Sequence, residues 1–67
     1  MADVRTSLTD RRRERGWSQQ TLAEHAGVSR QTIISIEKGR FDPSLPLAFR
    51  LARVLEVTIE ELFTPDD

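Results

Sequence analysis

The chain has 67 residues and a net charge of −1, because its ten lysines and arginines are offset by eleven aspartates and glutamates. This length supports one domain with a small core, and the absence of cysteine excludes disulfide bonds and thiolate-ligated zinc. With a single histidine and no apolar run near the roughly 20 residues that span a bilayer, the sequence predicts a cytoplasmic protein without a metal site.

The first predicted helix covers Val4–Arg15 and ends at Gly16, a residue that tolerates the left-handed conformation of a helix end. Its apolar face is thin, because Arg11 stands where the next core residue after Leu8 would fall. No part of the chain alternates apolar and polar residues over several positions, so no strand is expected.

Three further helices each follow a serine whose side-chain oxygen can cap the helix start. They are expected over Gln19–Ala26, Arg30–Lys38 and Leu45–Leu55. A short fifth helix begins with the capping-box pattern Thr58-Ile-Glu-Glu61 and ends near Phe63. The fourth helix is followed by Glu56 where a glycine would be expected, so either this residue takes a costly positive φ or the helix ends differently.

Apolar residues at helical spacing on these segments suffice for one core. The fourth helix contributes Leu45, Ala48, Leu51, Ala52 and Leu55, and the other segments contribute Leu8, Trp17, Leu22, Ala26, Val28, Ile33, Ile36, Val57, Ile59 and Leu62. The predicted fold class is therefore all-α, a compact five-helix domain that occupies residues 1–67 with its core at about 4–63.

The segment Gln19–Lys38 has the pattern of a helix-turn-helix. Two helices joined by a turn of three or four residues cross steeply, so the few positions where they touch must be apolar or small. Those positions hold Leu22, Ala23, Ala26, Val28, Ile33 and Ile36, with Gly27 opening the turn. The other positions are polar except Ile34, which predicts a polar outer face.

Three runs in and around this segment resemble one known family. They are Gly16-Trp-Ser-Gln-Gln-Thr-Leu-Ala23, Gly27-Val-Ser-Arg-Gln-Thr-Ile33 and Ile36-Glu-Lys-Gly-Arg-Phe-Asp-Pro-Ser-Leu45. Together they are similar to the phage-repressor (Cro/CI-type, or XRE-type) helix-turn-helix transcriptional regulators, and the similarity covers about Val4–Phe63. The resemblance implies a five-helix, nucleoid-associated regulator that binds an inverted-repeat operator in double-stranded DNA as a homodimer, and we expect a repressor.

In helix-turn-helix geometry the third helix lies in the major groove with its N-terminal residues at the base edges. The residues expected to read bases are Arg30, Gln31, Thr32, Ile34 and Ser35. Arginine can pair bidentately with guanine, and glutamine with adenine. Ile34 can meet a thymine methyl group, although packing against a neighbouring side chain is an equal alternative.

The residues expected to contact phosphate are Gln19, Ser29, Lys38 and Arg40. Gln19 resembles the family residue that contacts a phosphate, and helix N-termini favour anions; a solvated surface role is the alternative for the two cations. Residues 1–40 carry eight Arg or Lys against five Asp or Glu, whereas residues 41–67 carry two against six. This asymmetry suits a polyanion on one face, but ordinary surface charge also explains it.

The resemblance also implies a structural ion pair between Arg12 and Glu37, because relatives often pair an arginine of the first helix with a glutamate ending the third. Arg11 departs from the family, where an apolar residue is common, so either it lies along the core edge or the first helix is loosely held. His25 is expected on the surface, without a role.

A homodimer is expected because one such domain reads only a short half-site, and two copies about 34 Å apart give usable specificity. Its predicted contact is Ile59, Leu62 and Phe63, which offer more apolar surface than a short terminal helix can bury. An antitoxin or other protein-interaction module with the same fold is the alternative, although only about four residues follow Phe63. No nucleophile–base pair or phosphate-binding glycine loop is present, so we expect no enzyme, no cofactor and no small-molecule ligand.

Overall fold

Helix boundaries in this chain are set by side-chain caps. The computed structural model describes the backbone of residues 3–66 and the side chains of residues 5–64. Its helices are α1 (Leu8–Glu14), α2 (Gln19–Ala26), α3 (Arg30–Glu37), α4 (Leu45–Leu55) and α5 (Ile59–Leu62). Ser18, Ser29 and Ser44 each accept a hydrogen bond from a backbone N–H of the helix that follows. Thr58 and Glu61 form the expected capping box, so these four helix starts are confirmed.

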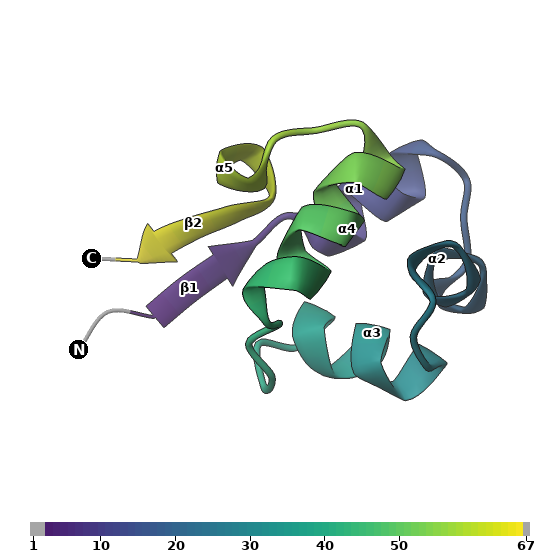
Figure 1. Cartoon of the computed structure of the whole chain (residues 1–67), viewed down its shortest axis with the longest axis horizontal. Coiled ribbons are helices and arrows are strands. Elements are labelled where there is room, and N and C mark those ends of the chain that lie inside the picture. The colour runs from purple at the N-terminus through teal and green to yellow at the C-terminus, as the bar shows by residue number, and fades with distance from the viewer. Residues whose placement is uncertain (1–2, 67) are drawn as a thin grey trace.

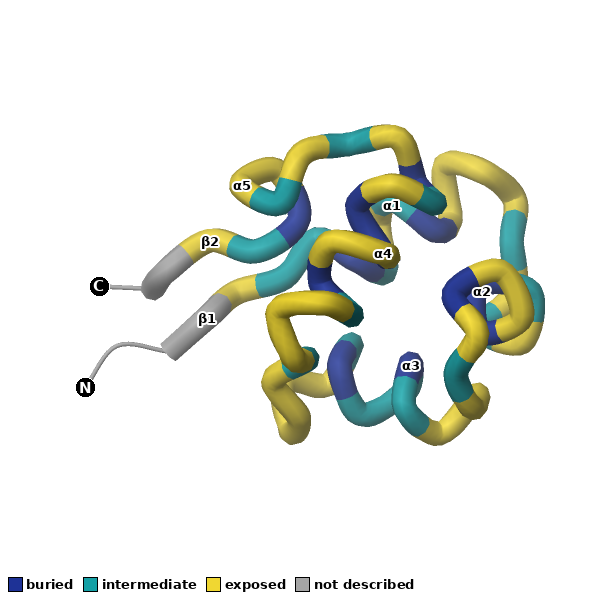
Figure 2. The backbone as a smooth tube through the Cα atoms, in the orientation of Figure 1, coloured by how far each residue is buried: buried dark blue, intermediate teal, exposed yellow. Residues whose placement is uncertain are grey.

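The five-helix architecture expected from the sequence is confirmed (Figure 1). The helices turn their buried residues toward one another (Figure 2), and the resulting core consists of Leu8, Leu22, Ala23, Ala26, Ile33, Ile36, Leu51, Ala52, Leu55 and Leu62. Leu45 was assigned to this core and does not belong to it, because it is 65% exposed. It occupies the first turn of α4, beyond the reach of the helices that cover the rest of the stripe. No helix within residues 3–66 is long and apolar enough to cross a membrane.

The first predicted helix is wrong over its first turn, because α1 begins at Leu8 and the preceding residues form strand β1 (Asp3–Thr6). This strand pairs antiparallel with β2 (Phe63–Asp66), so that Thr6 lies opposite Phe63 and Arg5 opposite Thr64. The two strands lie side by side at one end of the helical bundle (Figure 1). The N–H of Ser7 continues the pairing by donating to the carbonyl of Leu62 at 3.0 Å.

Ion pairs compensate for the thin apolar face of α1. Arg11 lies 3.6 Å from Glu61 of α5 and 3.8 Å from Glu14 of its own helix. The Thr6 hydroxyl accepts a hydrogen bond from the N–H of Leu8 at 3.1 Å, which satisfies the first backbone donor of the helix. α1 is thus tied to β1 at its start, and the Arg11–Glu61 ion pair links it to α5.

Candidate nucleic-acid interface

α2 and α3 meet through buried side chains and are joined by a short turn at Gly27. Leu22, Ala23 and Ile33 are fully buried at this contact, and the helices cross steeply, since Figure 1 shows α2 end-on and α3 lengthwise. Gly27 has φ 71°, a left-handed conformation that costs glycine little. The N–H of Val28 then donates to the carbonyl of Ala23 at 3.0 Å and fixes the turn.

The outer face of α3 carries the residues predicted to read bases. Arg30 and Gln31 are exposed, whereas Thr32, Ile34 and Ser35 are half-buried. The amide of Gln31 donates to the hydroxyl of Ser35 at 3.4 Å, a long bond that a better acceptor can replace. Within residues 5–64 the guanidinium of Arg30 has no hydrogen-bond or ion-pair partner. Arg30 and Gln31 can therefore form hydrogen bonds without first breaking strong internal ones, whereas the Thr32 hydroxyl already lies 2.9 Å from the Ser29 hydroxyl.

A network centred on Glu37 ties α3 to α1 and α2. Arg12 Nε lies 2.8 Å from Glu37 Oε2, and Arg12 Nη1 donates to the carbonyl of Trp17 at 2.8 Å. The two charged side chains are only 10% and 6% exposed. Gln19 Nε2 donates to Glu37 Oε1 at 3.1 Å. Partial burial alone would raise the pKa of Glu37, but hydrogen bonds from Arg12, Gln19 and Thr9, with the charge of Arg12, hold that pKa below its ordinary value.

The residues predicted to contact phosphate lie around α3 and at the start of α2. Ser29 caps α3, and Lys38 and Arg40 follow the end of that helix with exposed side chains that have no ion-pair partner within residues 5–64. Gln19 opens α2, where its bond to the Glu37 network uses one of its two amide hydrogens. The other hydrogen is available to an acceptor outside the chain, so Gln19 links the network to the surface.

A sequence profile described as helix-turn-helix matches residues 8–62, which include all five helices. The chain belongs to the helix-turn-helix family. An HTH-type transcriptional regulator of Methanothermobacter thermautotrophicus is 51% identical over 65 residues, which cover 96% of this chain and 94% of the relative. The restriction-modification controller protein C.AhdI from Aeromonas hydrophila is similar in structure, with a TM-score of 0.77 and 36% identity over 84% of this chain and 81% of C.AhdI.

The biofilm regulator SinR, whose structure was solved in complex with DNA, is also similar. It has a TM-score of 0.74 and 33% identity over 79% of this chain and 86% of SinR. The resemblance to XRE-type regulators is therefore confirmed, and the chain is a transcriptional regulator with a DNA-binding helix-turn-helix fold.

Two arginines of this helix-turn-helix regulator cap helix ends that lie far away in the sequence. Arg50 of α4 donates to the carbonyl of Ala26 at the end of α2, at 3.1 Å. Arg15 donates to the carbonyl of Leu55 at the end of α4, also at 3.1 Å, and pairs with Glu56 at 3.2 Å. The sequence did not predict either contact, because the partners are 24 and 40 residues apart and no local sequence pattern indicates such a pair.

Glu56 ends α4 in the left-handed conformation, with φ 58°, so the first of the two expected outcomes at this helix end is confirmed. It is the one non-glycine residue with positive φ in the described part of the chain. A residue with a side chain pays a steric penalty there, and the exposed ion pair between Glu56 and Arg15 contributes little against it.

His25 is exposed but stacks on Trp17, with ring centroids 4.3 Å apart and planes inclined by 18°. Its Nδ1 lies 2.9 Å from the carbonyl oxygen of Thr21, and the guanidinium of Arg15 lies 5.2 Å from the Trp17 ring centre. The histidine therefore covers an aromatic ring at the edge of the core. Within residues 3–66 no group of three or more His, Cys, Asp or Glu residues is placed to hold a metal ion.

The apolar residues predicted for the dimer contact are less accessible than the sequence indicated. Leu62 is fully buried in the core of its own chain, so its assignment to a partner contact is corrected. Ile59 and Phe63 are half-buried and pack against the same core. α5 and the start of β2 fold back onto the helical bundle. Most of the apolar surface of Ile59, Leu62 and Phe63 is therefore covered by the chain itself.

Proposed function

We propose that this regulator binds an inverted-repeat operator in double-stranded DNA as a homodimer and represses transcription from it in the cytoplasm, on the nucleoid. The observation that carries the proposal is the exposed, polar N-terminal face of α3, held in a fixed position by the buried α2–α3 contact and the Glu37 network. A face of this kind is what major-groove recognition requires. The DNA-bound structure of the similar SinR supports the same class of ligand.

Base reading is proposed for Arg30, Gln31, Thr32, Ile34 and Ser35. Arg30 has the free guanidinium that guanine O6 and N7 accept from, and Gln31 can exchange its long bond to Ser35 for a bidentate pair with adenine. The half-buried side chains behind them limit how deeply a base edge can approach. The specificity of the site would therefore depend most on the two exposed residues.

Phosphate contacts are proposed for Gln19, Ser29, Lys38 and Arg40, which lie on both sides of the reading residues. Contacts to the backbone fix the register of the protein on the duplex and carry no sequence information themselves. A net charge of −1 gives little general attraction to DNA. Binding would thus rely on this one face and on a second copy of it. No enzymatic activity is proposed.

The experiment that tests this proposal is selection of binding sites from random DNA, followed by binding of variants. Gln31→Ala should weaken binding to the selected site by about 1–3 kcal/mol and relax base preference at one position. The matched control is Gln20→Ala, because Gln20 is also exposed and also bonds a side chain four residues on, here Glu24 at 3.2 Å. Unchanged base preference in Gln31→Ala would overturn the placement of α3 in the major groove.

A further inference from the structure

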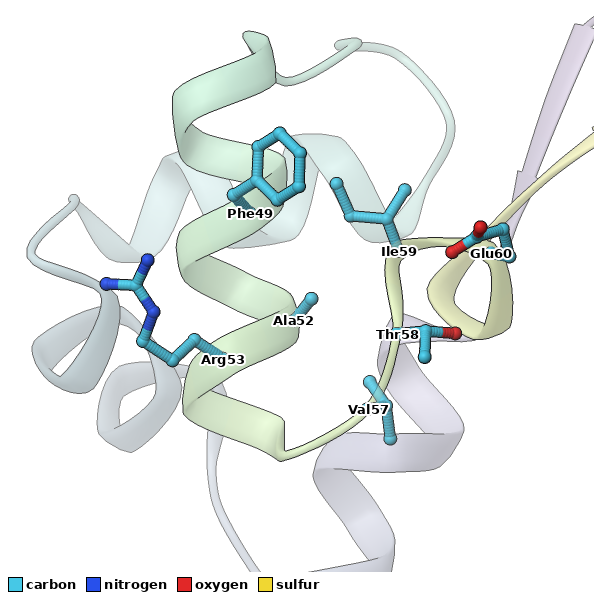
Figure 3. Close-up of a pocket in the computed structure, with 7 residues that line it drawn as sticks. All are labelled: Phe49, Ala52, Arg53, Val57, Thr58, Ile59 and Glu60. Carbon is cyan, nitrogen blue, oxygen red and sulfur yellow. The ribbon is translucent and has the colours of Figure 1, made fainter.

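Some cations among the described side chains, residues 5–64, hold no hydrogen bond or ion pair within that range. They are Arg13, Arg30, Lys38, Arg40 and Arg53. The proposed DNA contacts use the three that lie on α3 or directly after it, which leaves Arg13 and Arg53 without a role. Arg53 extends from α4 at the edge of an open groove of about 340 Å³ between α4 and α5 (Figure 3). Arg13 lies elsewhere, on the last turn of α1.

Hydrogen bonds place the last turn of α1 against the start of α2. The N–H of Gly16 donates to the carbonyl of Arg13 at 2.9 Å, and the N–H of Trp17 donates to the carbonyl of Arg12 at 3.2 Å. Arg12 Nη1 donates in turn to the carbonyl of Trp17 at 2.8 Å. The chain therefore turns tightly after α1, and Gln19 begins α2 directly beyond this turn.

The side of α1 that carries Arg13 faces the Glu37 network. Thr9 lies one helical turn before Arg13, so the two side chains leave the helix in nearly the same direction. The side chain of Thr9 hydrogen-bonds to Glu37, which also accepts a hydrogen bond from Gln19. Arg13 is exposed and lies on this same side of α1, one turn nearer to the start of α2.

The acidic neighbours of Arg13 on α1 leave its guanidinium available. Asp10 precedes it by one turn and Glu14 follows it, yet within residues 5–64 neither forms an ion pair with it. Glu14 lies instead 3.8 Å from Arg11. The exposed guanidinium can therefore bind an anion outside the chain without breaking an internal contact.

We propose that Arg13 binds a DNA phosphate adjacent to the one that Gln19 contacts, so that α1 and α2 hold neighbouring phosphates of one strand. A guanidinium can form two parallel hydrogen bonds to phosphate oxygens. Because Arg12 and Thr9 tie α1 to Glu37, the last residue of α3, Arg13 is held at a fixed distance from the base-reading residues. Its contact would thus help to set the register of the protein on the duplex. This inference rests on the proposed DNA binding and adds α1 to the DNA-binding surface.

The salt dependence of DNA binding tests this contact. Arg13→Ala should flatten the slope of log affinity against log salt concentration by about one unit, on the selected operator and on unrelated duplex alike, because one fewer counterion is released. Arg13→Lys should keep the slope, since lysine retains the charge. Arg53→Ala is the matched control, because it removes the same charge from another exposed arginine without a partner within residues 5–64, and its slope should not change. Fluorescence anisotropy measures the slopes, and an unchanged slope in Arg13→Ala would overturn the proposal.

Neutral phosphate analogues locate the contact on the duplex. A methylphosphonate replaces one charged phosphate at a time along the operator, and the natural chain should lose affinity at each contacted position. Arg13→Ala should become insensitive to the replacement at one position, next to the position at which Gln19→Ala becomes insensitive. Loss of sensitivity at distant positions in the two variants, or at no position in Arg13→Ala, would refute the contact and leave DNA binding standing. A natural chain that is insensitive at every position would instead refute the proposed DNA binding itself.

Discussion

The inner and outer faces of α3 differ in how firmly their side chains are held. On the inner face Ile33 and Ile36 are buried, and Glu37 is bonded to both α1 and α2. On the outer face Arg30 and Gln31 are exposed and hold no strong internal bond within residues 5–64. One helix thus separates stability from recognition, so substitutions on its two sides should change different measurements.

Arg12→Ala should have the largest effect, because it leaves the carboxylate of Glu37 nearly buried without its cation. Removing one partner of a buried pair costs about 3–5 kcal/mol of unfolding free energy, which is a large share of the stability of a small domain. Urea denaturation followed by circular dichroism measures this loss. Arg13→Ala is the control, since Arg13 is exposed on the same helix and should change stability by less than about 0.5 kcal/mol. Equal effects of the two variants would contradict the anchoring role of the inner face.

Acid should also weaken the Arg12–Glu37 contact, with a smaller loss of unfolding free energy than in Arg12→Ala. The folded-state pKa of Glu37 lies below its ordinary value of 4.5, so its contribution to stability is present above that pH and is lost as pH falls through the folded pKa. The difference in unfolding free energy between the natural chain and Glu37→Gln should therefore shrink below about pH 4.5. Part of the acid sensitivity should persist in Glu37→Gln, because backbone and side-chain hydrogen bonds at Thr58 also lower the pKa of Glu61. Urea midpoints at several pH values provide the measurement, and a constant difference would exclude titration of Glu37.

The parts of the fold that the sequence predicts are those with local determinants. The caps Ser18, Ser29 and Ser44 act on backbone groups three residues away, and the α2–α3 contact repeats at intervals of three and four residues. The strand Asp3–Thr6 has no such signal, because four residues are too few for a period and its partner is Phe63–Asp66, at the other end of the chain. A helix continued from α1 would have left that partner unpaired.

The site was predicted in the same uneven way. Periodicity and the family resemblance identify which residues of α3 are exposed, because the core stripe of one helix determines its other side. They do not show what buries an apolar residue. Leu62 was therefore assigned to a partner although its own chain covers it, and Phe49 was overlooked although it is exposed. An apolar side chain indicates burial, and only the tertiary structure identifies the surface that buries it.

Arg30→Ala tests the outer face. It should leave the urea midpoint unchanged and weaken binding to the selected operator by about 1–3 kcal/mol, with relaxed preference at one base pair. Arg30→Lys separates charge from geometry, because lysine keeps the positive charge but cannot form the bidentate pair with guanine. Fluorescence anisotropy with operator and with single-base variants measures both effects. If Arg30→Lys retained full base preference, Arg30 would be a phosphate contact and not a base reader.

Lys38→Ala should have the smallest effect and the least sequence dependence. Lys38 follows the last turn of α3, where its exposed ammonium group suits a backbone phosphate. Losing one such contact releases one fewer counterion, so the slope of log affinity against log salt concentration should flatten by about one unit for every DNA sequence alike. Anisotropy titrations at several salt concentrations, with operator and with unrelated DNA, measure this slope. Glu24→Gln is the control, because it changes the net charge by the same amount as Lys38→Ala but in the opposite direction, and Glu24 makes no proposed DNA contact. A flattened slope on operator DNA alone would show that Lys38 reads bases and does not contact phosphate. The base-reading surface would then extend past the last turn of α3.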